Sequence, residues 1–231
     1  MPLIFLVLGY WLTMAVVSAI PVLGQLAGFI LIPSFSVSLM NACRQIDKKE
    51  ELPPRVLFSG FNRNPRTLFT LGLIYVLSAL AILGISALFD SGLLFRMLVM
   101  DETPTREMLE QTPMFVSAQL TAVLLIPVIL AFWFAPVLAA WHDMSAGKSL
   151  FFSLVACLRN WRPFLLYALA VVVIAVFVPR LLDVLLRTVD KSGQLLPIAI
   201  TVTVSLILLP TLYASFYISY RDIFVGLQKK Y

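Results

Sequence analysis

Six long apolar runs constrain the fold of this sequence more than any other feature. A helix that crosses the hydrocarbon core of a bilayer needs about 20 predominantly apolar residues. The runs cover residues 2–20, 22–41, 67–89, 113–141, 163–186 and 195–217, and the central part of each lacks ionisable residues. Since lipid offers backbone groups no partner outside their own segment, we expect six transmembrane helices and an all-α membrane protein.

The composition excludes a water-soluble domain. Hydrophobic residues make up 61% of the 231 residues and charged residues only 13%, whereas soluble domains average about 25% charged residues. So few charges cannot cover the surface of a soluble fold. No basic residue precedes the first run, and the run is longer than the apolar core of a signal peptide. We therefore expect it to be the first span and not a cleaved leader.

The charged residues are sorted between alternate loops. The loops after the second and fourth runs and the C-terminal tail hold twelve of the 17 basic residues. The other loops hold five basic residues and seven of the twelve acidic ones. By the positive-inside rule, both termini face the cytoplasm. The net charge of +5 therefore serves topology, and we expect no nucleic-acid partner.

Short similarities indicate an internal repeat of helical hairpins. Arg63-Asn64-Pro65-Arg66 begins the third run and Arg159-Asn160-Trp161-Arg162 begins the fifth. Each even-numbered run contains an apolar residue followed by proline, at Pro33, Pro136 and Pro210, where a lost backbone hydrogen bond predicts a kink. We predict a single membrane domain (residues 1–231) of three parallel hairpins, at about 2–42, 55–143 and 149–220. The alternative is that prolines are simply frequent in membrane helices.

The first unit lacks the basic, partly apolar segment that precedes the other two. If the repeat is real, we expect an in-frame upstream extension that contains an Arg-rich amphipathic stretch. On the outer side, Thr103 and Pro104 predict the start of a short interfacial helix. Residues 179–190 space their leucines as a helix on the lipid surface does.

Gly24 and Gly28 fit the small-xxx-small pattern that lets two helices approach closely. We expect them to pack within the chain, with dimerisation as the alternative. Gln25, Gln119 and the few other polar residues at depth are typical of contacts between helices.

The sequence contains no constellation for catalysis or metal binding. Intramembrane ionisable residues mark proton relays and paths for charged substrates, and the apolar runs lack them. His142 and Asp143 adjoin, but no second ligand or nucleophile lies nearby, and no zinc motif occurs. We expect no catalytic residue, no metal, no cofactor and no enzyme activity.

The candidate functional residues are the two basic clusters that begin the third and fifth runs. Clusters of this kind at the cytoplasmic interface bind anionic headgroups, and a tryptophan there is an aromatic anchor. The alternative is an ordinary topology signal. The candidates are Arg63, Asn64, Arg66, Arg159, Asn160, Trp161 and Arg162.

At Trp133-Phe134-Ala135-Pro136, Ser153 and Arg159-Asn160-Trp161, the sequence resembles an uncharacterised family of six-helix bacterial inner-membrane proteins. It is distantly similar to the YciC-like proteins and to the membrane domain attached to some glycerophosphodiester phosphodiesterases. The resemblance covers nearly the whole chain and implies a six-helix fold whose members begin further upstream. It implies no activity, catalytic residue or cofactor.

Together these observations favour a non-catalytic inner-membrane protein that contacts anionic lipid at the cytoplasmic face, or another membrane protein, or a second copy of itself. The alternative is a transporter of a neutral or lipidic substrate, because parallel repeats and broken helices recur in transporters. A water-accessible cavity between the proline-bearing helices would favour transport. A solidly packed bundle with an exposed apolar face would favour a partner role.

Overall fold

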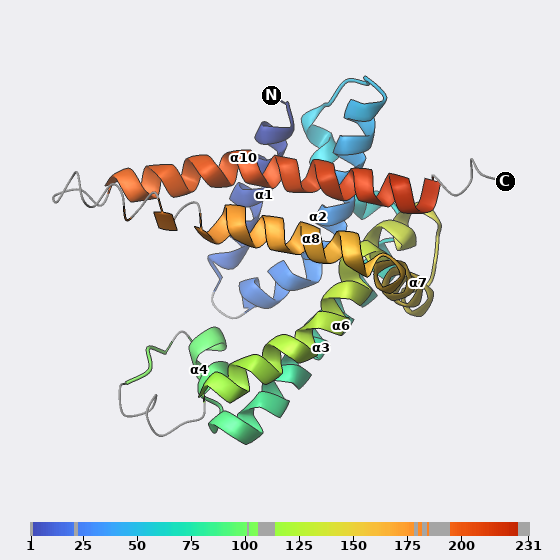
Figure 1. The fold of residues 1–231 in the computed structure, drawn as a ribbon. Helices are drawn as coiled ribbons and strands as arrows, with labels where there is room; N and C mark the ends of the chain where they lie inside the picture. Colours follow the sequence, from blue (N-terminus) through green and yellow to red (C-terminus); the bar gives the residue numbers. More distant parts are fainter. Residues whose placement is uncertain are drawn as a thin grey trace.

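The computed structural model describes residues 2–20, 23–100, 102–105, 114–177, 180–181, 184 and 195–225. These residues form α-helices joined by short 3₁₀ and π segments, without a strand (Figure 1). The elements are α1 (Pro2–Ser18), α2 (Leu23–Asp47), the 3₁₀ segment η1 (Pro54–Asn62), α3 (Pro65–Asp90), α4 (Leu93–Val99), α6 (Met114–Trp141), α7 (Ala146–Arg159), α8 (Trp161–Val172), the π segment η2 (Val173–Phe177), α10 (Leu195–Tyr220) and the π segment η3 (Arg221–Val225).

Among the residues that the structure describes, three helices, α2, α3 and α6, are long and apolar enough to cross a membrane. Helices α7 and α8 pass the same test together, but they bend by 87° where Asn160 joins them, and as one broken span they would be the fourth. Helix α1 is apolar and shorter, with 17 residues. The all-helical membrane fold is therefore confirmed, and six separate spans stay a prediction.

Helix α4 does not follow from the apolar runs. It begins because Asp90, at the end of α3, accepts hydrogen bonds from the backbone N–H groups of Gly92 at 2.9 Å and Leu94 at 3.3 Å. The Ser117 hydroxyl of α6 donates to the same carboxylate at 2.7 Å. Asp90 is thus a buried acid whose oxygens satisfy a helix start and connect α3 to α6.

The two interfacial helices predicted on the outer side fall largely outside the described residues. Residues 102–105 have no regular structure, and the chain that follows them lies outside the description, as does most of 179–190.

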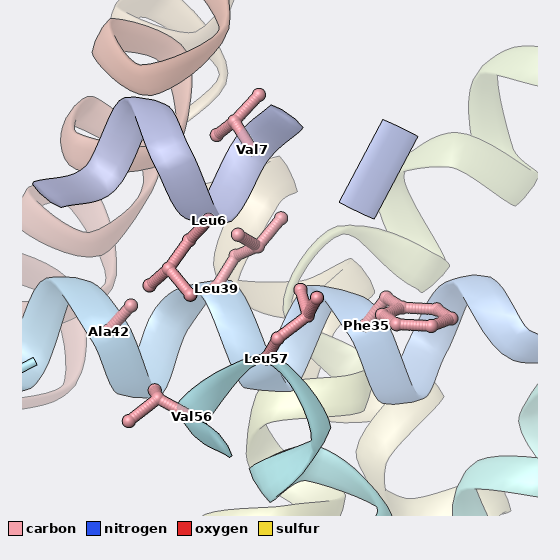
Figure 2. Close-up of a cluster of buried hydrophobic side chains, with 7 residues drawn as sticks. All are labelled: Leu6, Val7, Phe35, Leu39, Ala42, Val56 and Leu57. Atoms are coloured by element: carbon pink, nitrogen blue, oxygen red, sulfur yellow. The ribbon is translucent and has the colours of Figure 1, made fainter. Parts of the chain in front are cut away.

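One apolar core lies where α1 and η1 pack on α2 (Figure 2). The ring of Phe35 meets Tyr10 and Phe61 edge to face, with centroids 5.2 and 5.1 Å apart. Such aromatic contacts add to the apolar area that is removed from solvent. The buried members are Leu6, Val7, Phe35, Leu39, Ala42, Val56 and Leu57.

Two glycines that sequence reasoning missed allow backbones to approach α2. A Cβ atom at Gly72 of α3 would lie 2.3 Å from the carbonyl oxygen of Ile30, and one at Gly60 of η1 would lie 2.0 Å from that of Ser34. Gly24 and Gly28 both face α1: their Cβ atoms would meet the Val17 carbonyl and the Met14 side chain.

The three prolines on which the predicted repeat rests lie inside continuous helices, Pro33 in α2, Pro136 in α6 and Pro210 in α10. A kink at each stays a prediction. Helices α3 and α6 lie side by side, and α8 lies along α10 (Figure 1). The contact between α8 and α10 includes a hydrogen bond of 2.8 Å between the hydroxyls of Tyr167 and Ser215.

Candidate lipid-contacting site

The first basic cluster forms the corner between η1 and α3. Arg63 is extended, and Asn64 then takes the left-handed conformation, with φ of 48° and ψ of 49°, before Pro65 begins the helix. Asparagine tolerates this conformation better than most residues. The Asn64 side-chain amide donates to the carbonyl oxygen of Ala139 in α6 at 3.1 Å. Asn64 therefore fixes the corner, and the Arg63 and Arg66 side chains remain exposed.

The second basic cluster forms the corner between α7 and α8. Asn160 ends α7, where its backbone N–H bonds to the carbonyls of Ala156 and Cys157 and its side-chain amide donates to Ala156 at 2.8 Å. Arg159 and Arg162 are exposed. The Arg162 guanidinium lies 5.6 Å from the centre of the Trp161 ring, which is itself 56% exposed. This corner presents two cations and an aromatic side chain.

The two corners share a design, although no contact joins their arginines among the described residues. In each corner, a shorter helix packs against the long helix before it, η1 on α2 and α7 on α6. An asparagine, Asn64 or Asn160, then precedes an apolar helix, α3 or α8. None of the four arginine side chains forms an ion pair with any residue that the structure describes. Their charges are therefore available to an external anion.

Helix α7 packs against α6 through apolar side chains and through the hydroxyl of Ser153. The Ser153 hydroxyl donates to the carbonyl oxygen of Leu130 and accepts from the backbone N–H of Phe134, both at 2.9 Å. It therefore takes the place of an i→i−4 bond of α6. At the first corner, the backbone N–H of Gly60 in η1 donates to the Ser38 hydroxyl of α2 at 2.9 Å.

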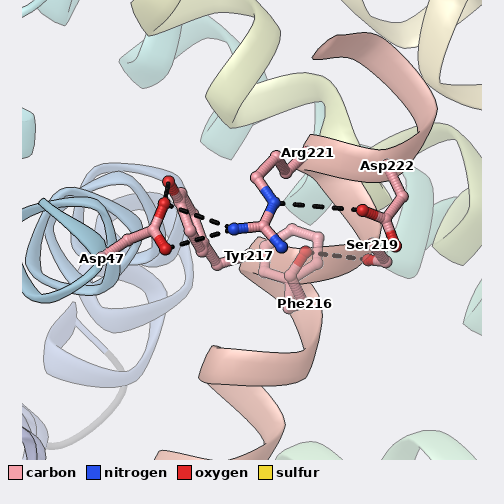
Figure 3. Close-up of polar contacts among 6 residues, drawn as sticks. All are labelled: Asp47, Phe216, Tyr217, Ser219, Arg221 and Asp222. Atoms are coloured by element: carbon pink, nitrogen blue, oxygen red, sulfur yellow. Dashed lines mark hydrogen bonds and ion pairs between the residues drawn. The ribbon is translucent and has the colours of Figure 1, made fainter. Parts of the chain in front are cut away.

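The C-terminal ends of α2, α6 and α10 are joined by polar contacts between residues far apart in the sequence. The Trp141 indole N–H donates to Asn41 at 2.9 Å, and His142 bonds with Tyr220 at 2.6 Å. Figure 3 shows the third connection, in which Asp47 accepts from Tyr217 at 3.0 Å and from Arg221 at 3.1 Å. Nothing in the apolar runs identified these partners.

A cavity of about 880 Å³ lies beside the second corner, between α7, α8 and the end of α10 with η3. Most of its wall is apolar, with Trp133 of α6 among the aromatic side chains. The Tyr167–Ser215 hydrogen bond links two of its walls. Its polar lining consists of Arg159, Asn160, Tyr167, Ser215, Ser219 and Asp222.

The chain is similar to a curated membrane protein. The chain is 36% identical, over 99% of its length and 86% of the relative's, to a protein of Burkholderia thailandensis that is named as a probable inner membrane protein. No family model matches the sequence, and no solved structure matches the fold. The identity and coverage place the chain in the family of inner-membrane proteins to which this Burkholderia protein belongs.

Proposed function

We propose that this chain is a non-catalytic inner-membrane protein, with six spans and both termini in the cytoplasm, that holds anionic phospholipid at its cytoplasmic face. The main support is that four arginines are exposed and lack ion-pair partners among the described residues, namely Arg63, Arg66, Arg159 and Arg162. Guanidinium groups bind phosphate oxygens in a bidentate way. Each basic residue near an anionic surface contributes about 1 kcal/mol to binding.

The contacts among the ends of α2, α6 and α10 support the orientation that the proposal requires. Three hairpins of like orientation would bring the ends of their second helices to one side of the membrane. The contacts of Asn41 with Trp141, His142 with Tyr220 and Asp47 with Arg221 agree with this arrangement. The predicted similarity to YciC-like proteins and to glycerophosphodiester phosphodiesterase membrane domains would also imply six spans.

The test compares two variants that each lose four basic residues. One carries Arg63→Gln, Arg66→Gln, Arg159→Gln and Arg162→Gln. The control carries Lys48→Gln, Lys49→Gln, Arg55→Gln and Lys148→Gln, which remove the same charge from the same predicted side. After gentle purification from native membranes, mass spectrometry measures the anionic lipid and the proteins that accompany each variant.

We expect the corner variant to retain at least about tenfold less anionic lipid than the wild type, because its guanidinium groups bind phosphate oxygens in a bidentate way. The control should stay near the wild-type value. Equal retention by the two variants, or recovery of a lone lipid-free wild-type monomer, would contradict the proposal.

A second candidate function is transport of a neutral or lipidic substrate, and the cavity beside α8 and α10 favours it. Its wall includes residues of α6 and α10, the helices that carry Pro136 and Pro210. Reconstituted vesicles with labelled lipid in one leaflet test this function. Lipid exchange between leaflets that depends on the protein would support transport. If no such exchange occurs, transport of lipid is contradicted and the proposal that the protein holds anionic lipid is unaffected.

A further inference from the structure

Two opposite charges line the cavity without pairing to each other. Arg159 enters from the end of α7 and Asp222 from η3. The Arg159 guanidinium has no ion-pair partner among the described residues. Among the residues that the structure describes, the Asp222 carboxylate pairs only with Arg221, at 3.9 Å, and the guanidinium of Arg221 also binds Asp47 at 3.1 Å (Figure 3). The Arg159 guanidinium is thus unpaired among the described residues, and the Asp222 carboxylate has one long ion pair and an exposed side chain, so both can meet an opposite charge on a ligand.

The rest of the cavity suits a hydrocarbon chain. Its volume of about 880 Å³ lies within the range of about 300–1,000 Å³ that small-molecule sites occupy. Apolar wall is supplied by α7 through Phe152 and Val155, by α8 through Phe164, and by η3 through Ile223 and Phe224. A soluble polar metabolite would leave this surface uncovered, whereas a lipid covers it and presents its headgroup to Arg159 and Asp222.

We infer that this cavity binds one zwitterionic phospholipid, with the phosphate on Arg159, a primary ammonium group on Asp222, and an acyl chain along the apolar walls. An anionic headgroup would match Arg159 but face repulsion from Asp222. A quaternary ammonium would supply the positive charge without the N–H donors that a carboxylate accepts. Phosphatidylethanolamine carries both the phosphate and the primary ammonium.

This inference rests on the proposed function in one respect, because Arg159 belongs to both sites. Arg63 and Arg66 do not line the cavity. The paired variant Arg63→Gln and Arg66→Gln therefore tests anionic lipid at the first corner without altering the cavity.

The experiment uses full-length protein, freed of lipid in mild detergent. It is titrated with phosphatidylethanolamine, phosphatidylcholine and phosphatidylglycerol of the same acyl chains, and native mass spectrometry counts the bound lipid. We expect one tightly bound phosphatidylethanolamine, preferred about tenfold over either other lipid, which is the effect of one charge-assisted hydrogen bond.

Two variants, each with a matched control, separate binding of the headgroup from binding of the acyl chain. Asp222→Asn should abolish the preference for phosphatidylethanolamine over phosphatidylglycerol, whereas Glu51→Gln, which removes an acid away from this cavity, should preserve it. Ser219→Leu places a larger side chain in the cavity and should abolish the tight binding. Ser219→Ala loses the same hydroxyl without adding volume and should bind as the wild type does.

An unchanged preference in Asp222→Asn, unchanged binding in Ser219→Leu, or a preference for phosphatidylglycerol in the variant that carries Arg63→Gln and Arg66→Gln would overturn the inference. If the Arg63 and Arg66 variant keeps its anionic lipid while phosphatidylethanolamine binding still depends on Asp222, the proposed function fails and this inference stands. If the Arg63 and Arg66 variant loses its anionic lipid and phosphatidylethanolamine binding does not depend on Asp222, the proposed function stands and this inference fails.

Discussion

Asn64 and Asn160 occupy corresponding places in the two corners but differ in backbone conformation and in the partner of the side-chain amide. Asn64 is left-handed, with φ of 48°, and its amide donates to Ala139 in another helix. Asn160 has φ of −113°, and its amide donates to Ala156 in its own helix. The sequence predicted the clusters but not this difference, because the partner of Asn64 lies 75 residues away.

Asn64→Ala should destabilise the protein more than Asn160→Ala does. The first change places alanine in a left-handed conformation, at about 1–2 kcal/mol, and also removes a hydrogen bond worth about 1 kcal/mol. The second removes only a hydrogen bond of that size. Thermal unfolding midpoints in one detergent measure both, and equal shifts would contradict this account of the first corner.

Gly72 and Gly84 of the same helix provide a matched pair. A Cβ at Gly72 would lie 2.3 Å from the Ile30 carbonyl, whereas a Cβ at Gly84 has nothing within 4 Å. Gly72→Ala should therefore force α3 away from α2, at about 1–3 kcal/mol. Gly84→Ala should leave the thermal midpoint unchanged or raise it, because alanine favours helices. A Gly72→Ala protein as stable as the wild type would contradict this packing.

At the scale of the elements, the apolar runs predicted α3 and α6 well because both are long and continuously apolar. They did not predict α4 or the bend at Asn160. Those features depend on contacts between elements, namely Asp90 with Ser117 and Ser153 with the backbone of α6. Hydropathy along the chain does not identify partners that are distant in sequence. The start of α4 and the bend at Asn160 therefore could not be predicted from it.

The connections among the helix ends should differ in strength. The Asp47–Arg221 pair is nearly half exposed on both sides, at 43% and 44% of its side-chain surfaces, and exposed ion pairs contribute about 0–1 kcal/mol. Trp141→Phe removes a donor and leaves the Asn41 oxygen without that partner, at about 1–3 kcal/mol. Unfolding midpoints should therefore fall further for Trp141→Phe than for Asp47→Asn, and the reverse order would show that the ion pair dominates.

At the scale of the whole molecule, the cavity and the joined helix ends could not be predicted from the sequence. Asp47 and Arg221 lie 174 residues apart, and the cavity wall combines residues from Trp133 to Phe224. The sorting of charges predicted one property of the whole molecule, its orientation. The proposed lipid contacts of the corner arginines depend on this predicted orientation, because the proposed function places both corners at the cytoplasmic face.

The most direct test of the account is the side of the membrane that each loop occupies. In a variant with Cys43 and Cys157 replaced by alanine, single cysteines at Lys48, Lys148 and Glu102 are exposed to a membrane-impermeant maleimide in spheroplasts. We expect labelling of Glu102→Cys, while Lys48→Cys and Lys148→Cys react only after the membrane is opened. Labelling of Lys48→Cys or Lys148→Cys in sealed spheroplasts would place a basic corner outside the cell and contradict the account.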